Sequence, residues 1–90
     1  FNLDNSEMII AKKIIGNYAK KIRHIVEYSQ LKLEMKSHKK AKNIKFEVKA
    51  VVNFEGGVAA AEATEFNPFT AIDEALKKVL QEIEHKIKEK

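Results

Sequence analysis

The side chains that could do chemistry in this 90-residue chain are mostly cations, and they gather in its first half. Residues 1–49 carry 12 Lys or Arg against 5 Asp or Glu, a net charge of +7, whereas residues 50–90 carry 5 against 8, a net charge of −3. A basic half of this kind indicates a polyanionic partner, most often nucleic acid in a cytosolic protein. The alternative is a lysine-rich solvated surface, and composition alone does not separate the two.

The residue types that bind metals or catalyse reactions show no convergent spacing. His24, His38 and His85 fall on three separate predicted elements and the chain has no cysteine, which favours solvated histidines over a metal site. Most carboxylates lie beside lysines, which argues against a general acid–base pair. Gly56-Gly57 opens no helix, so it predicts a turn rather than a phosphate-binding loop. The sequence therefore predicts a binding protein rather than an enzyme, with no metal and no cofactor.

An amphipathic helix should position the largest group of cations. Asp4 and Glu7 have the spacing of a capping box, which predicts that the helix starts here. Apolar residues then recur at three- and four-residue steps and predict one buried stripe, made of Met8, Ala11, Ile14, Ile15, Tyr18, Ile22 and Ile25. Five cations lie opposite that stripe or on its flanks over about 16 Å, at 1.5 Å per residue. These are Lys12, Lys13, Lys20, Lys21 and Arg23.

Alternating apolar and polar residues predict strands over 31–36 and 44–52. The polar segment 37–43 between them is interpreted as a basic loop carrying Lys39, Lys40 and Lys42. Residues 53–57 contain the glycines of a hairpin turn.

The alanine-rich stretch 58–64 favours a helix by propensity, but its position favours a strand. It follows a turn and precedes Asn67-Pro68, which resembles a helix cap with proline at the first helical position. As a strand it would turn Ala59, Ala61 and Ala63 towards a closely packed helix. A second amphipathic helix from Pro68 is predicted by its own apolar stripe, made of Phe69, Ile72, Ala75, Leu76, Val79, Leu80, Ile83 and Ile87. The chain should thus be one α+β domain over residues 1–90, with two helices on one face of an antiparallel three-stranded sheet.

This order, together with several short strings, resembles the ribosome hibernation promoting factor family. The clearest stretch runs from Gly56-Gly57 to Asp73. It has a paired-glycine turn, a strand with alternate small residues, an aromatic early in the last helix, and the string Ala71-Ile72-Asp73. A weaker match lies at residues 18–22, and the resemblance covers nearly the whole chain. It implies a β-α-β-β-β-α fold related to double-stranded RNA-binding domains. Here only Phe1-Asn2-Leu3 precedes the predicted helix cap, so the leading strand is missing, truncated or reduced to a stub.

The resemblance also implies a function, namely translation inhibition under stress by a protein lodged on the small ribosomal subunit over its tRNA and mRNA sites. Cations of both helices would contact ribosomal RNA. By position, that role falls on Lys20, Lys21 and Arg23 in the first helix. In the second helix it falls on Lys78, His85, Lys86 and Lys88. Acidic residues offset the positive charge of this second helix. The expected RNA-binding surface therefore shifts towards the first helix and residues 38–42.

The predicted RNA-binding residues are therefore Lys12, Lys13, Lys20, Lys21, Arg23, Lys39, Lys40, Lys42, Lys78, His85, Lys86 and Lys88. Phe54 and Phe66 could stack on bases, but an aromatic near a strand end more often caps the core. The alternative function is a protein-interaction module or a homodimer formed through an open sheet edge. Either way we expect a cytoplasmic protein with no membrane partner, because no apolar run reaches the roughly 20 residues of a membrane span.

Overall fold

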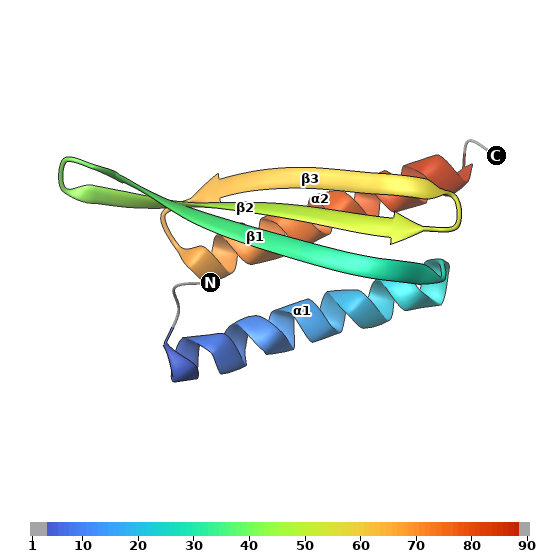
Figure 1. The fold of residues 1–90 in the computed structure, drawn as a ribbon, viewed down its shortest axis with the longest axis horizontal. Helices are drawn as coiled ribbons and strands as arrows, with labels where there is room; N and C mark the ends of the chain where they lie inside the picture. The colour runs from blue at the N-terminus through green and yellow to red at the C-terminus, as the bar shows by residue number, and fades with distance from the viewer. Residues whose placement is uncertain (1–3, 89–90) are drawn as a thin grey trace.

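The fold is one antiparallel sheet with two helices against a single face of it. The computed structural model describes residues 4–88, apart from the side chain of Lys40. Its elements are α1 (Asn5–Ile25), β1 (Tyr28–Lys40), β2 (Asn43–Phe54), β3 (Gly57–Glu65) and α2 (Pro68–Lys88). The strands lie in the order β1-β2-β3, and Figure 1 shows both helices behind or below the sheet. The predicted α+β class and element order are confirmed.

Both helices begin where their capping residues predict. The Asp4 carboxylate accepts a hydrogen bond from the Glu7 backbone N–H at 2.8 Å, and the Glu7 carboxylate accepts one from the Asp4 N–H at 3.2 Å. This is a complete capping box. At α2, the Asn67 side-chain oxygen accepts from the N–H groups of Phe69 and Thr70 at 2.8 and 3.2 Å. Each cap satisfies amide donors that have no partner inside the helix.

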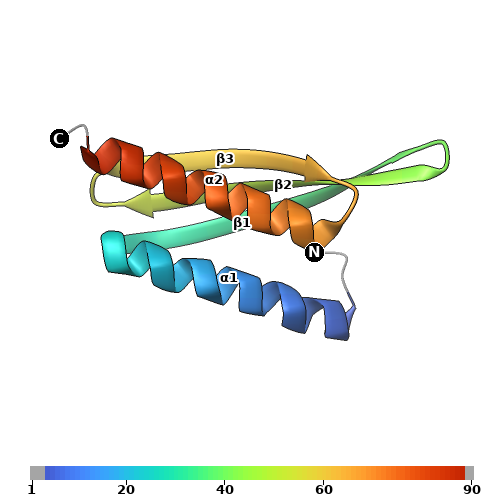
Figure 2. The same cartoon turned by 180° about the vertical axis from the view of Figure 1, so that it is seen from behind.

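The core lies between α2 and the inner faces of β2 and β3. Ala59 and Ala63 are buried beneath α2 and Ala61 is half-buried, as expected for small residues under a close-packed helix. Helix α2 supplies the largest group of buried side chains, namely Ala71, Ile72, Ala75, Leu76, Val79 and Ile83. Helix α1 packs mainly against α2 and contacts the sheet at β1, as Figure 2 shows from behind. Two of its residues, Ala11 and Ile22, are fully buried.

The prediction of a loop over residues 37–43 is wrong. Strands β1 and β2 stay paired to the end of the hairpin, through Lys39 opposite Ile44 and Lys40 opposite Asn43. Only Ala41 and Lys42 form the turn, and Ala41 adopts a left-handed φ of 54°. The sequence has no glycine there to mark a tight turn, and its run of lysines resembles solvated loop composition. Lys39 and Lys40 are therefore strand residues, and Lys42 is a turn residue.

The two long edges of the sheet differ in how they are covered. Along β3, the ammonium groups of Lys78 and Lys86 donate hydrogen bonds to the outward carbonyls of Glu62, at 3.3 Å, and Val58. Along β1, no strand of residues 4–88 pairs with the outer edge. The reduced leading strand implied by the family resemblance would fall on residues 1–3, outside the described residues. The β1 edge is thus the less covered of the two.

Candidate nucleic-acid interface

The clearest basic surface is the α1 basic face, which we define as Lys12, Lys13, Lys20, Lys21 and Arg23. All five side chains are exposed, opposite or flanking the stripe of α1 that packs against the core. Residues 8–26 contain no Asp or Glu, so no acid on the helix interrupts the face. Its cations therefore present an undivided positive surface over about 16 Å of helix.

Two of these cations are held against aromatic rings. The Lys21 ammonium lies 4.9 Å from the centroid of the Tyr18 ring, and the Arg23 guanidinium lies 5.8 Å from that of Tyr28. An Arg23 N–H also points at the Tyr28 hydroxyl over a long 3.5 Å. Cation–π contacts of this kind restrict long side chains at exposed sites. The charges of Lys21 and Arg23 are thereby placed at defined positions on the helix surface.

Tyr18 links the α1 basic face to α2. Its hydroxyl donates a hydrogen bond to the Asp73 carboxylate at 2.9 Å. Burial of the phenol raises the pKa of Tyr18 to about 12, and the Asp73 hydrogen bond, the charge of Asp73 and that of Glu74 act in the same direction. All four causes favour the neutral phenol, so the contact between helices depends on that proton.

Raising the pH should weaken the protein through Tyr18. The pKa of Tyr18 rises from 10.0 unfolded to about 12 folded, so its stabilisation is complete below pH 10 and is lost as pH rises towards 12. At 1.36 kcal/mol per pKa unit the full difference would be about 2.7 kcal/mol, and solvent screening of this partly exposed phenol should reduce the loss to roughly 1–2 kcal/mol. Urea unfolding of the wild type and Tyr18→Phe at several pH values measures it. The stability advantage of the wild type should shrink across this window, and a constant difference would contradict the assignment.

A second basic group lies on the hairpin tip, which we define as residues 37–45. Its described lysines, Lys39, Lys42 and Lys45, are exposed, and residues 36–46 contain no acid. Lys45 is not among the predicted site residues, because strand alternation alone does not show that the hairpin extends past β3. In the structure β3 ends at Glu65, opposite Phe46, while β1 and β2 continue beyond it.

The two basic groups run along a molecule whose extents are 47 × 24 × 15 Å. The start of α1 lies at the same end of the long axis as the hairpin tip, and the end of α1 lies towards the opposite end (Figures 1 and 2). Lys12 and Lys13 are therefore nearer the hairpin tip, and Lys20, Lys21 and Arg23 are farther from it. This elongated distribution of charge suits an extended polyanion better than a small anion.

The predicted cations of α2 do not join the α1 basic face. Lys78 and Lys86 reach the β3 edge, whereas Tyr18 of α1 meets Asp73 on another side of α2. His85 is exposed beside Lys78 in a shallow hollow that also includes Glu82. Lys88 is exposed in the last turn of α2. The structure thus separates the predicted residues of the second helix from those of the first.

The outer face of the sheet carries charges of both signs. Lys36 lies opposite Glu47, and Lys49 lies between Glu34 and Glu62 in the strand register. Cross-strand neighbours of opposite charge offset one another. This face is consequently a weaker attractant for phosphate than α1 or the hairpin tip.

The two aromatic residues that could stack on bases differ in their exposure. Phe54 is 9% exposed and belongs to the core, whereas Phe66 is 61% exposed just after β3. Tyr18 and Phe69 pack against the core, as their helical stripes predict. Phe66 is the aromatic available to a ligand at the end of the sheet.

The three histidines lie on α1, β1 and α2, and His38 sits 3.4 Å from the Glu47 carboxylate. Within residues 4–88, no three His, Asp or Glu side chains come together as a metal site would require. Neither helix in that range has the length and apolarity needed to cross a membrane. A scan against protein-family models and a search of curated proteins gave no match to this chain.

Proposed function

We propose that this protein is a ribosome-associated RNA-binding protein that inhibits translation under stress by occupying the decoding and tRNA region of the small subunit. The observation that carries the proposal is the α1 basic face, where five exposed cations share one side of a rigid helix without an intervening acid. The hairpin tip adds a second positive group at one end of the long axis. The proposal places the protein in the cytoplasm.

The chemistry of structured RNA favours this interpretation of the charge. Proteins contact A-form RNA largely through phosphates and 2′-hydroxyl groups, which calls for several cations on a rigid element and little recognition of base edges. The α1 basic face supplies such cations, and two of them are held by aromatic rings. The α-β-β-β-α order also matches the last five elements of the fold that the family resemblance implies.

Co-sedimentation with purified small ribosomal subunits tests the proposal. The protein should pellet with subunits at low salt and be released as salt rises, because phosphate contacts release counterions. If five cations contact phosphate, affinity should fall roughly 100- to 500-fold between about 50 and 200 mM salt. Absence of the protein from the pellet at both salt concentrations would refute the proposal.

A homodimer through the β1 edge is the second candidate, favoured by the register that this strand offers to a copy of itself. In antiparallel pairing centred on Leu33, Lys32 of each chain faces Glu34 of the other, so two pairs of opposite charge form across the axis. The same register places Leu31 opposite Met35. Both of these side chains are half-buried and pack at the border of the core. Charge and apolar surface are therefore complementary in one alignment.

Exchanging the charges on β1 tests this register. Glu34→Lys should weaken self-association about tenfold by turning both charge pairs repulsive, and the double variant Lys32→Glu/Glu34→Lys should restore it. Sedimentation velocity over a range of protein concentrations measures the effect. Glu62→Lys on β3 is the control and should leave association unchanged. A wild-type protein that stays monomeric throughout would exclude the dimer.

A further inference from the structure

An exposed aromatic ring stands at the end of the sheet without a packing role. Phe66 is 61% exposed, the largest fraction among the exposed large hydrophobic side chains of residues 4–88. It lies between Glu65, the last residue of β3, and Asn67, which caps α2. Both neighbours along the chain therefore belong to the fold's regular elements or their caps. A phenylalanine left in water forgoes most of the stabilisation that its burial would provide. The ring therefore calls for an explanation outside the core.

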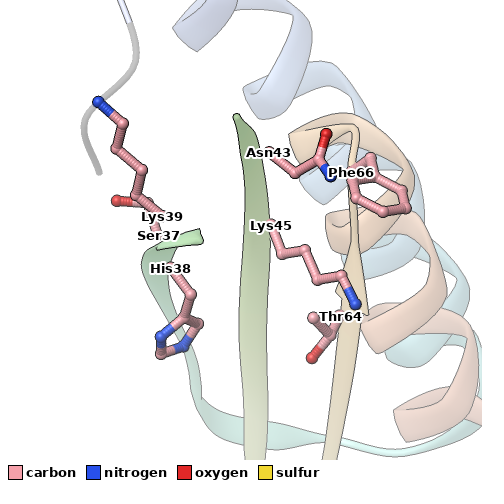
Figure 3. Close-up of a pocket in the computed structure, with 7 residues that line it drawn as sticks. All are labelled: Ser37, His38, Lys39, Asn43, Lys45, Thr64 and Phe66. Atoms are coloured by element: carbon pink, nitrogen blue, oxygen red, sulfur yellow. The ribbon is translucent and has the colours of Figure 1, made fainter. Parts of the chain in front are cut away.

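The ring borders a hollow that the hairpin creates. Strands β1 and β2 extend beyond the end of β3, and an open hollow of about 800 Å³ lies between the hairpin tip and the end of β3. Figure 3 shows Phe66 and Thr64 on one side of this space, Asn43 and Lys45 on β2, and His38 and Lys39 on β1. The volume is in the range of sites that hold a small organic ligand.

The lining of the hollow combines one aromatic surface with positive charge. The Lys45 ammonium lies 5.3 Å from the centroid of the Phe66 ring, and Lys39 lies on the neighbouring strand. Asn43 and Thr64 add neutral hydrogen-bonding groups, and no Asp or Glu lines the hollow. The nearby Glu47 carboxylate is already in contact with His38 at 3.4 Å. A ligand suited to this lining has a flat apolar ring joined to a negative group.

We propose that the Phe66 hollow binds one unpaired nucleotide of an RNA, with the base stacked on the Phe66 ring and its phosphate near Lys45. This inference rests on the proposed RNA-binding function and names the form of RNA recognised at this end of the molecule. Stacking on an aromatic side chain accepts any base, because every base has a π-face. A continuous duplex keeps the faces of its bases stacked on one another, so none of them is free to stack on the ring. The hollow thus selects a bulge, a loop or a single-stranded end.

Two RNAs that differ by one nucleotide test the inference, a fully paired hairpin and the same hairpin with a single unpaired base. The wild type should bind the bulged RNA more tightly. Phe66→Ala should lower affinity for the bulged RNA about 5- to 150-fold, the range found when one stacking aromatic is removed. Its affinity for the paired RNA should change less than about twofold. Phe66→Tyr should retain the preference, since it keeps the ring.

A matched control and a direct signal sharpen the result. Val58→Ala, another exposed apolar residue on the β3 side but at the opposite end of that strand, should leave both affinities unchanged. A fluorescent aminopurine in the unpaired position should be quenched by the wild type and not by Phe66→Ala. If the wild type binds RNA but Phe66→Ala keeps the wild-type preference for the bulged RNA, the hollow is not a nucleotide site and the proposed function stands. If the wild type binds neither RNA nor ribosomal subunits, both proposals fail.

Discussion

Reversing Lys20, Lys21 and Arg23 to glutamate is expected to lower affinity for small ribosomal subunits by at least about 100-fold at moderate salt. The variant removes three of the five cations of the α1 basic face and replaces them with three acids that repel phosphate. These side chains are exposed, so the fold should persist. The slope of binding against salt should also fall by about one for each phosphate that the variant no longer neutralises. Quantitative co-sedimentation across a salt series reads both changes.

The control for that variant makes the same change in net charge at three lysines outside the α1 basic face. Lys32, Lys36 and Lys77 are exposed and lie outside the α1 basic face, on the sheet and on α2. Their reversal to glutamate should reduce affinity far less, because only general attraction is weakened. Circular dichroism on both variants checks that the helices persist. Equal reductions in the two variants would mean that net charge, and not the α1 basic face, determines binding.

Replacing Leu76 with alanine should have the largest effect on stability. Leu76 is fully buried in the middle of α2, and the inward-facing residues of β3 are alanines, whose short side chains cannot fill a cavity beneath the helix. Large-to-small changes at such positions cost about 2–5 kcal/mol. A 90-residue domain has roughly 5–13 kcal/mol in total, so the melting temperature should fall by roughly 10–25 °C.

An exposed apolar residue of a helix provides the comparison for Leu76→Ala. Ile9 on α1 is 59% exposed, and Ile9→Ala should change the free energy of unfolding by less than about 0.5 kcal/mol. Thermal and urea unfolding of both variants measure the difference. Similar small effects for both would mean that Leu76 is not packed in the core.

The parts of the fold that could be predicted are those whose signals are local. Asp4 and Glu7 indicate the start of one helix and Asn67-Pro68 that of the other, because capping depends on residues a few positions apart. Alternation identifies β1 and β2, whereas the turn before residue 58 and the cap at Asn67-Pro68 identify β3. Once β3 is a strand, Ala59 and Ala63 face inward, since every second residue of a strand shares a face. The five cations of the α1 basic face are predictable for the same reason, as they follow from helical periodicity alone.

The rest depends on contacts between distant parts of the chain. Residues 37–43 have the polar composition of a loop, yet β1 and β2 stay paired through them to the end of the hairpin. Phe54 follows the alternation of β2 into the core, but no local pattern shows that β3 ends just before Phe66 and leaves its ring exposed. Likewise, Lys78 and Lys86 bind carbonyls of β3 that are 16 and 28 positions away in the sequence.

The lysines that cover the β3 edge also limit how far copies of this protein could assemble. A sheet with both edges open can add strands at each side, and such contacts propagate into filaments. Here Lys78 and Lys86 occupy two carbonyls along one edge, which makes β1 the more open side for strand addition. When two copies join through β1 around a twofold axis, each β1 edge is paired with the other. Assembly would therefore close at two chains, with the capped edges facing outwards.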